Sequence, residues 1–374
     1  MKIFIEPNDV LMFRDGKPFS GGDDHYARGI FPPPPSTFYG ALRSKILSEK
    51  YPQYESFKNG EVPEDIRKEI GTPSEQGNLA INNFFIARKT DDYIHPIFPV
   101  PKDMMKTKGK DGNDPFLLTP CESLGNKVTS NLPIVSLTPL WLKTENPIEE
   151  VNGFLSLKAM ESYLTGKIPD TGEIIQSESL YMKDERVGIK KDRTTKTVAT
   201  GALYSVEYFR FAKDIGFAVE LDGVENFPSQ GLLRLGGDHR SAFYKESPFS
   251  LPDKEKVKNK IKDTGLFKII FLTPAIFEKG WMPDWIDANS GIGTVNNITL
   301  KLISAALGKP VHIGGFDLVK KTPKDMKRAV SAGSIFYLQL EKGSIDEVFD
   351  AFWLKSISTE KRNEGFGITI IGGY

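Results

Sequence analysis

Several features that mark common classes of protein are scarce or absent in this sequence. Cys121 is the only cysteine, which excludes an internal disulfide framework and a cysteine-rich zinc site and is typical of a reducing cytosol. The first ten residues, MKIFIEPNDV, reach charge and proline before an apolar run is long enough for a secretory leader or a membrane span. We therefore expect a cytoplasmic protein with no membrane contact.

An excess of one charge is also missing. The 49 lysines and arginines balance the 49 aspartates and glutamates, so the whole molecule has no strong field that would draw it onto nucleic acid. Any RNA-binding surface must therefore come from local patches of basic residues.

The sequence contains few patterns that are typical of catalytic or metal-binding sites. His25, His95, His239 and His312 show no metal-ligand spacing, and no serine lies in a nucleophile elbow. The adjacent aspartates in the glycine-rich segment 22–25 are more typical of a turn than of a metal site. The sequence therefore predicts no metal, no cofactor and no catalytic residue. The best enzymatic alternative is metal-independent cleavage of RNA, with His25 as the general base.

The chain is longer than one ordinary core supports, so its 374 residues predict two domains. The first covers 1–262 with a large insertion at about 100–200, and the second covers 263–374. The lysine-rich segment 253–263 is expected to be a solvated linker between them. The order of strands, a late helix over 344–357 and a last strand predicts an α+β fold with antiparallel sheets and helices on one face.

Four consecutive prolines, at 32–35, lead into a helix whose apolar spacing begins at Phe38. A proline run is stiff and lacks backbone donors, so the next free N–H groups lie at the helix start, where Ser36 is the expected N-cap. A helix start of this kind suits a phosphate. The alternative is that the prolines only stiffen a connection and Tyr39 packs locally. The residues that could bind a nucleotide here are Arg14, Lys17, Arg28, Ser36, Thr37, Tyr39 and Arg43.

A second basic patch lies in segment 182–201, which lacks clear periodicity and is predicted to be a loop before an aromatic-rich strand. Cations beside aromatic rings suit single-stranded nucleic acid, because charge follows the phosphates while rings stack on bases. An ordinary solvated surface is the alternative. The basic residues of this segment are Arg186, Lys190, Lys191, Arg193 and Lys196.

Two glycine-rich segments add candidate contacts. His239 and Arg240 follow a pair of glycines, where a tight turn between strands is the alternative interpretation. Gly365 and Gly367 precede the last predicted strand, where glycine would let an RNA backbone approach closely. No Walker-type lysine and serine or threonine follow them, so this is not a nucleotide phosphate loop.

Four stretches together resemble a known family. DVLMFRDGKPF, FPPPPSTFYGALRS, ERVGIKKDRTTKTVATGALYSVEYFRF and the glycine-rich end are similar to the third subunits of the Cmr effector, a type III-B CRISPR complex, in the repeat-associated mysterious protein superfamily. The similarity runs from the first strand to the last and is weakest between residues 100 and 180. The sequence departs from the family pattern at Lys17, where arginine is frequent, and at Asp238, where glutamate is expected.

The resemblance implies two ferredoxin-like (RRM-like) domains and no catalytic activity. It implies a subunit that holds the 5′ tag of the CRISPR RNA and contacts the large polymerase-like subunit and a backbone subunit, with targets read by the guide and no DNA read directly. The alternatives are an endoribonuclease of the same superfamily that matures CRISPR RNA, and a protein-interaction subunit without RNA contact. The implied tag-binding residues are Arg14, Ser36, Tyr39, Arg43, the segment 186–196, His239 and Arg240.

Overall fold

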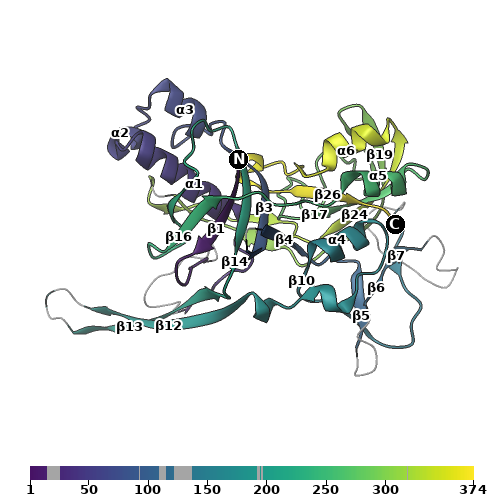
Figure 1. The fold of residues 1–374 in the computed structure, drawn as a ribbon, viewed down its shortest axis with the longest axis horizontal. Coiled ribbons are helices and arrows are strands. Elements are labelled where there is room, and N and C mark those ends of the chain that lie inside the picture. Colours follow the sequence, from purple (N-terminus) through teal and green to yellow (C-terminus); the bar gives the residue numbers. More distant parts are fainter. Residues whose placement is uncertain are drawn as a thin grey trace.

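A computed structural model gives the fold of the chain (Figure 1). The structure describes residues 1–14, 26–91, 93–108, 115–121, 137–191, 194, 197–317 and 319–374. Most strand pairs are antiparallel, and helices are few, as the sequence predicts for an α+β protein. Within these residues, no helix combines the length and the apolar character that crossing a membrane requires.

The first large sheet is built mainly from the N-terminal part of the chain. Its eight strands lie in the order β11-β10-β4-β3-β14-β1-β16-β15, so strands far apart in the sequence are neighbours. In chain order they are β1 (Lys2–Pro7), β3 (Ala80–Thr90), β4 (Tyr93–Pro99), β10 (Phe154–Leu155), β11 (Ile174–Ile175), β14 (Ile215–Asp222), β15 (Gln230–Arg234) and β16 (Ser241–Glu246).

Helix α1 (Pro35–Lys50) packs on one face of this sheet. Its apolar positions recur every four residues, and the ring of Phe38 lies 4.7 Å from that of Phe84 on β3 and 4.6 Å from that of Phe217 on β14. Two short helices that the sequence did not reveal, α2 (Tyr54–Lys58) and α3 (Glu64–Ile70), follow it. The helix predicted after the proline run is thus confirmed.

The second large sheet comes from the C-terminal part. Its six strands lie in the order β18-β19-β24-β17-β26-β25, and helix α6 (Ile345–Phe352) begins with a capping box of Ser344 and Glu347. The strands are β17 (Leu266–Phe271), β18 (Ile292–Val295), β19 (Ile298–Ala306), β24 (Ile335–Lys342), β25 (Lys355–Ser356) and β26 (Ile368–Gly372).

The expectation of a solvated linker before this sheet is wrong. The segment forms helix α5 (Lys254–Ile261), which Asp253 caps by accepting hydrogen bonds from the first N–H groups. Val257 and Ile261, four residues apart, are buried on one side of the helix. Two well-placed apolar residues are therefore enough to dock an otherwise charged helix.

The region expected as an insertion contains short strands, one helix and a long hairpin. The expected loop over 182–201 is wrong, because β12 (Tyr181–Lys191) pairs with β13 (Val198–Phe211) and extends away from the body (Figure 1). Elsewhere lie helix α4 (Leu157–Leu164) and the short elements β5 (Met104–Thr107), β6 (Pro115–Leu117), β7 (Thr119–Pro120), β8 (Leu140–Trp141), β9 (Ile148–Glu150), η1 (Thr171–Glu173) and η2 (Ser177–Ser179). The remaining elements are β2 (Tyr26–Ala27), β20 (Val311–Ile313), β21 (Phe316–Asp317), β22 (Thr322–Pro323), β23 (Lys327–Ala329) and η3 (Arg362–Glu364).

A buried polar network joins the first half of the chain to the second sheet. Asp103 is 0% exposed and accepts hydrogen bonds from the hydroxyls of Tyr163 (2.7 Å) and Tyr337 (2.6 Å). Lys268 on β17 is 1% exposed; its Nζ lies 2.9 Å from the Asp103 carboxylate and 3.7 Å from the centroid of the Tyr163 ring. Burial lowers the pKa of Lys268, while the carboxylate opposes that shift. Burial and then Asp103 raise the pKa of both tyrosines.

Breaking this network from one side is expected to be costly. In Lys268→Met the Asp103 carboxylate stays buried without its cation, so we expect the free energy of unfolding to fall by about 3–5 kcal/mol. Urea denaturation followed by circular dichroism measures the change. The matched control is Lys254→Met, which removes an exposed pair with Asp350 at 3.8 Å and should change little. Equal effects of the two substitutions would contradict the importance of the buried pair.

Candidate nucleic-acid interface

The proline run approaches α1 as a half-buried ramp. The expectation that Ser36 is the N-cap is wrong: Pro34, in an extended conformation, occupies that position, and Pro35 is the first helical residue. No side chain caps the helix, and the Thr37 N–H donates to the Pro34 carbonyl at 3.0 Å. Pro33 and Pro35 are buried, while Ser36 and Thr37 are half-buried in the first turn.

Two residues of α1 that the sequence assigned to RNA face the protein instead. Tyr39 is only 6% exposed, so its ring is not accessible to a base. The same burial raises the pKa of its hydroxyl. The Arg43 guanidinium donates to the carbonyls of Ile70 (2.7 Å) and Thr72. Burial lowers the pKa of Arg43. These side chains tie α1 to the end of α3, and we leave both out of the candidate interface.

The C-terminal glycines also serve internal packing. Gly365 (φ 89°) and Gly367 (φ 68°) are buried in left-handed conformations that favour glycine. A Cβ on Gly365 would lie 3.2 Å from that of Pro35, and one on Gly367 would lie 2.5 Å from the Ser358 nitrogen. The close approach that these glycines permit is therefore to protein, and they too leave the candidate interface.

Arg14 and Arg28 lie on the two segments that meet beside strand β13 of the hairpin. Both are exposed, and Arg14 forms an isolated antiparallel bridge with Gly29. Arg28 directly follows β2, which pairs in parallel with β13. Lys17, His25, Arg193 and Lys196 lie outside the described residues.

The hairpin arm, residues 181–191 and 198–211, is fixed at its base by aromatic packing. The ring of Phe31 lies 4.0 Å from that of Tyr181, 5.6 Å from that of Phe209 and 6.1 Å from that of Phe211. Register runs from Tyr181 opposite Phe211 out to Lys191 opposite Val198. Lys190 and Lys191 therefore belong to the outer part of the arm, away from the core.

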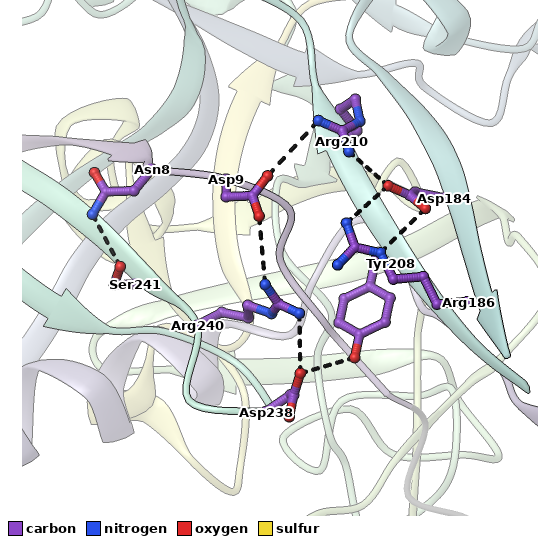
Figure 2. Close-up of polar contacts among 9 residues, drawn as sticks. All are labelled: Asn8, Asp9, Asp184, Arg186, Tyr208, Arg210, Asp238, Arg240 and Ser241. Carbon is purple, nitrogen blue, oxygen red and sulfur yellow. Dashed lines mark hydrogen bonds and ion pairs between the residues drawn. The ribbon is translucent and has the colours of Figure 1, made fainter. Parts of the chain in front are cut away.

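A network of alternating charges surrounds the base of the arm (Figure 2). Asp184 on β12 contacts Arg186 (3.1 Å) and Arg210 (2.7 Å), and Arg210 reaches Asp9 at 3.7 Å. We call the set of seven residues the Asp–Arg cluster. Its members are Asp9, Asp184, Arg186, Tyr208, Arg210, Asp238 and Arg240.

Tyr208 is at the centre of the cluster. Its hydroxyl donates to Asp238 at 2.9 Å, and the guanidinium carbons of Arg186 and Arg240 lie 5.0 and 4.9 Å from its ring centroid. Arg240 also contacts Asp9 (3.4 Å) and Asp238 (3.1 Å). The cluster thereby joins the arm to the loop after β1 and to the turn before β16. His239, with φ 52°, is exposed in that turn.

The cluster is neutral, because three carboxylates match three guanidiniums. The hydrogen bond from Arg186, followed by that from Arg210, lowers the pKa of Asp184. The ionised Asp184 carboxylate therefore stabilises the fold at pH values above the ordinary aspartate pKa. This contribution is lost as the pH falls through the lowered pKa. Burial, followed by Asp238, raises the pKa of Tyr208. At neutral pH the pairs are therefore intact.

Among the described residues, no group of three or more His, Cys, Asp or Glu side chains could hold a metal ion. The described residues form a projecting hairpin with exposed arginines beside it and a charged network at its base.

Comparison with known proteins decides the family. The family model described as "CRISPR-associated protein (Cas_Cmr3)" matches residues 3–373. The chain belongs to this family. The resemblance expected from the four sequence stretches is confirmed, and the Cas_Cmr3 match covers the body, the arm and the second sheet alike.

Individual relatives of this Cas_Cmr3 chain are distant. A curated protein of Saccharolobus solfataricus, "CRISPR system CMR subunit Cmr3", is 26% identical over 158 residues, which span 40% of this chain and 42% of that protein. A chain of the cryo-EM structure of the type III-B Cmr-beta bound to cognate target RNA and AMPPnP has a TM-score of 0.50 and 18% identity, covering 90% of this chain and 86% of that one. A chain of another cryo-EM structure, of the type III-B Cmr-beta bound to cognate target RNA, has a TM-score of 0.49 and 17% identity over the same shares of the two chains. The first of these structures supports the fold of the Cas_Cmr3 chain.

Sequence reasoning found Arg186 and Arg240 but missed their aspartate partners. The missing signal was strand periodicity: on a strand, Asp184 and Arg186 share one face, as do Tyr208 and Arg210. Asp9 and Asp238 come from other segments and have no local signal.

The cluster should hold the arm in place. Asp184→Asn removes the charge that two arginines share, so we expect amide hydrogen exchange in β12 and β13 to become about two- to fivefold faster, as for exposed ion pairs. Hydrogen exchange with mass spectrometry measures this. Asp263→Asn, at an exposed position after α5, is the control and should leave the arm unchanged. Unchanged exchange in Asp184→Asn would show that the aromatic base alone fixes the arm.

Proposed function

We propose that this chain is the third subunit of a type III-B CRISPR effector and binds the 5′ tag of the CRISPR RNA with the hairpin arm. The observation that carries the proposal is the arm itself, which projects from a rigid base and has Lys190 and Lys191 in its outer part. Arg28 directly follows β2, which pairs with strand β13 of the arm, and Arg14 forms a bridge with Gly29, the residue after Arg28. A narrow, extended, basic element can follow a single strand of RNA, whose phosphates dominate affinity.

The remaining parts of the proposal concern partners and role. The chain bridges the large polymerase-like subunit to a backbone subunit, acts in the cytoplasm and contributes no catalytic residue of its own. In this proposal the two large sheets are the cores of two ferredoxin-like units, 1–262 and 263–374, and helix α5 lies at the end of the first unit. Arg186, His239 and Arg240 take part through the base of the arm, where Arg186 and Arg240 already bind carboxylates.

RNA binding by the arm is expected to depend steeply on salt. Replacing both outer lysines, in Lys190→Gln/Lys191→Gln, should weaken binding of a tag-containing single-stranded RNA and reduce the slope of log K against log salt by about 1.4, since each phosphate contact contributes about 0.7. Fluorescence anisotropy at several salt concentrations measures both. Lys254→Gln/Lys256→Gln on α5 removes the same charge elsewhere and is the control.

Two results would count against the proposal. A salt-independent affinity would contradict electrostatic binding, and equal losses in both double variants would show that the arm is not the binding element. Incubation of the purified protein with CRISPR repeat RNA in EDTA tests the endoribonuclease alternative. Specific cuts that disappear in His25→Ala would favour that activity, and intact RNA would favour a binding subunit.

A further inference from the structure

A polar cleft of about 400 Å³ lies between the first sheet and the segment that follows α6. The strand residues that line it include Lys2, Asn83 and Glu220, and the opposite wall includes Trp353, Lys355 and Arg362. Glu220 lies near the end of β14, whereas the arm joins the beginning of that strand. The cleft is therefore at the opposite end of the sheet from the proposed RNA-binding arm.

The floor of the cleft is one row of side chains across three strands. In the register of the sheet Lys2 is opposite Glu220, and Glu220 is opposite Asn83, so the three share a face. Asn83 is only 4% exposed, and its Nδ2 donates to a Glu220 carboxylate oxygen at 2.7 Å. Because a carboxylate only accepts hydrogen bonds, this contact fixes which way the amide points.

That orientation leaves an acceptor without a donor. The Oδ1 atom of Asn83 is buried and has no hydrogen-bond partner within the part of the chain that the structure describes. A buried polar atom without a partner costs free energy, and a ligand that brings a donor would remove this cost. Lys2 already donates from its Nζ to the Phe249 carbonyl at 3.2 Å, and the Asn83 amide donates to Glu220. The acceptors left for a ligand are Asn83 Oδ1 and the Glu220 carboxylate, so this floor suits a ligand that presents N–H groups.

The walls add an aromatic ring and positive charge. Trp353 is half-buried, and the ring of Phe349 backs it at 5.4 Å. Lys355 and Arg362 are exposed, and Arg362 is held by an Nε hydrogen bond to the Ser358 carbonyl at 2.7 Å. The next residue after the tryptophan, Leu354, has φ 54°, a strained conformation for a branched residue that sets the course of this wall.

We propose that this cleft binds a guanine nucleotide. The Watson–Crick edge of guanine carries two adjacent donors, N1–H and N2–H, which match the acceptors of Asn83 and Glu220. The base would stack on Trp353, and its phosphate would lie against Lys355 and Arg362. A lysine or arginine side chain of a protein partner could also donate to Asn83 and Glu220. The positive charges of Lys355 and Arg362 would repel such a side chain. The nucleotide is either free or one residue of a single-stranded RNA.

Binding to the full-length protein tests the inference. Isothermal titration with GMP should give saturable binding that is at least about tenfold tighter than that of AMP, since a matched pair of base contacts discriminates by that order. Guanosine without phosphate should bind more weakly than GMP. Glu220→Gln should weaken GMP binding by about tenfold or more, whereas Glu341→Gln, an exposed change on β24, should leave it unaltered.

Further variants keep the test valid if Glu220→Gln fails to fold. Arg362→Gln alters an exposed side chain and should remove most of the difference between GMP and guanosine. A short RNA with one guanine that competes with GMP would identify RNA as a source, and one that does not compete would identify the free nucleotide. Equal binding of GMP and AMP, or none at millimolar ligand, would overturn the inference and leave a water-filled cleft. Neither result bears on the arm, whose test uses other residues.

Discussion

The Asp103–Lys268 pair is the constraint on which the arrangement of the two sheets depends. A charge buried to this degree is tolerated only when a partner and hydrogen bonds surround it, and here two tyrosine hydroxyls complete that surrounding. Asp103 precedes β5, whereas Lys268 and Tyr337 belong to the second sheet. Neither part can leave the other without exposing an uncompensated charge. One continuous apolar cluster extends through both sheets around this pair.

The continuous apolar core fixes the positions of two surfaces, the hairpin arm and the polar cleft. The arm projects from aromatic packing around Phe31, and the cleft lies between the first sheet and the segment after α6. The two polar networks differ in kind. The buried one stabilises because breaking it strands a charge, while the Asp–Arg cluster is solvated and can only orient the arm. Stability and positioning are thus supplied by different residues.

Local periodicity in the sequence made some of the helices and strands predictable. The elements and site residues that depend on long-range contacts could not be predicted in this way. The first strand and α1 follow from apolar spacing that any single segment displays. The arm escaped recognition because β12 carries charges on both faces, so that only pairing with β13 defines it. Tyr39 and Arg43 were assigned to a ligand because their burial depends on α3 and its following turn. The floor of the cleft brings together residues 2, 83 and 220, which no local pattern connects.

Charge balance decides where affinity for RNA can arise. In the Asp–Arg cluster a phosphate would replace a carboxylate that each arginine already binds, so the exchange yields little net attraction. The cluster is therefore suited to holding the arm at a fixed angle, and in the proposed interface the attraction for RNA comes from the outer lysines. The proposal therefore predicts weak binding of RNA by the isolated chain, because a protein of zero net charge would make only a few such contacts. Under the same proposal, tight binding would require neighbouring subunits to add contacts along the same strand of RNA.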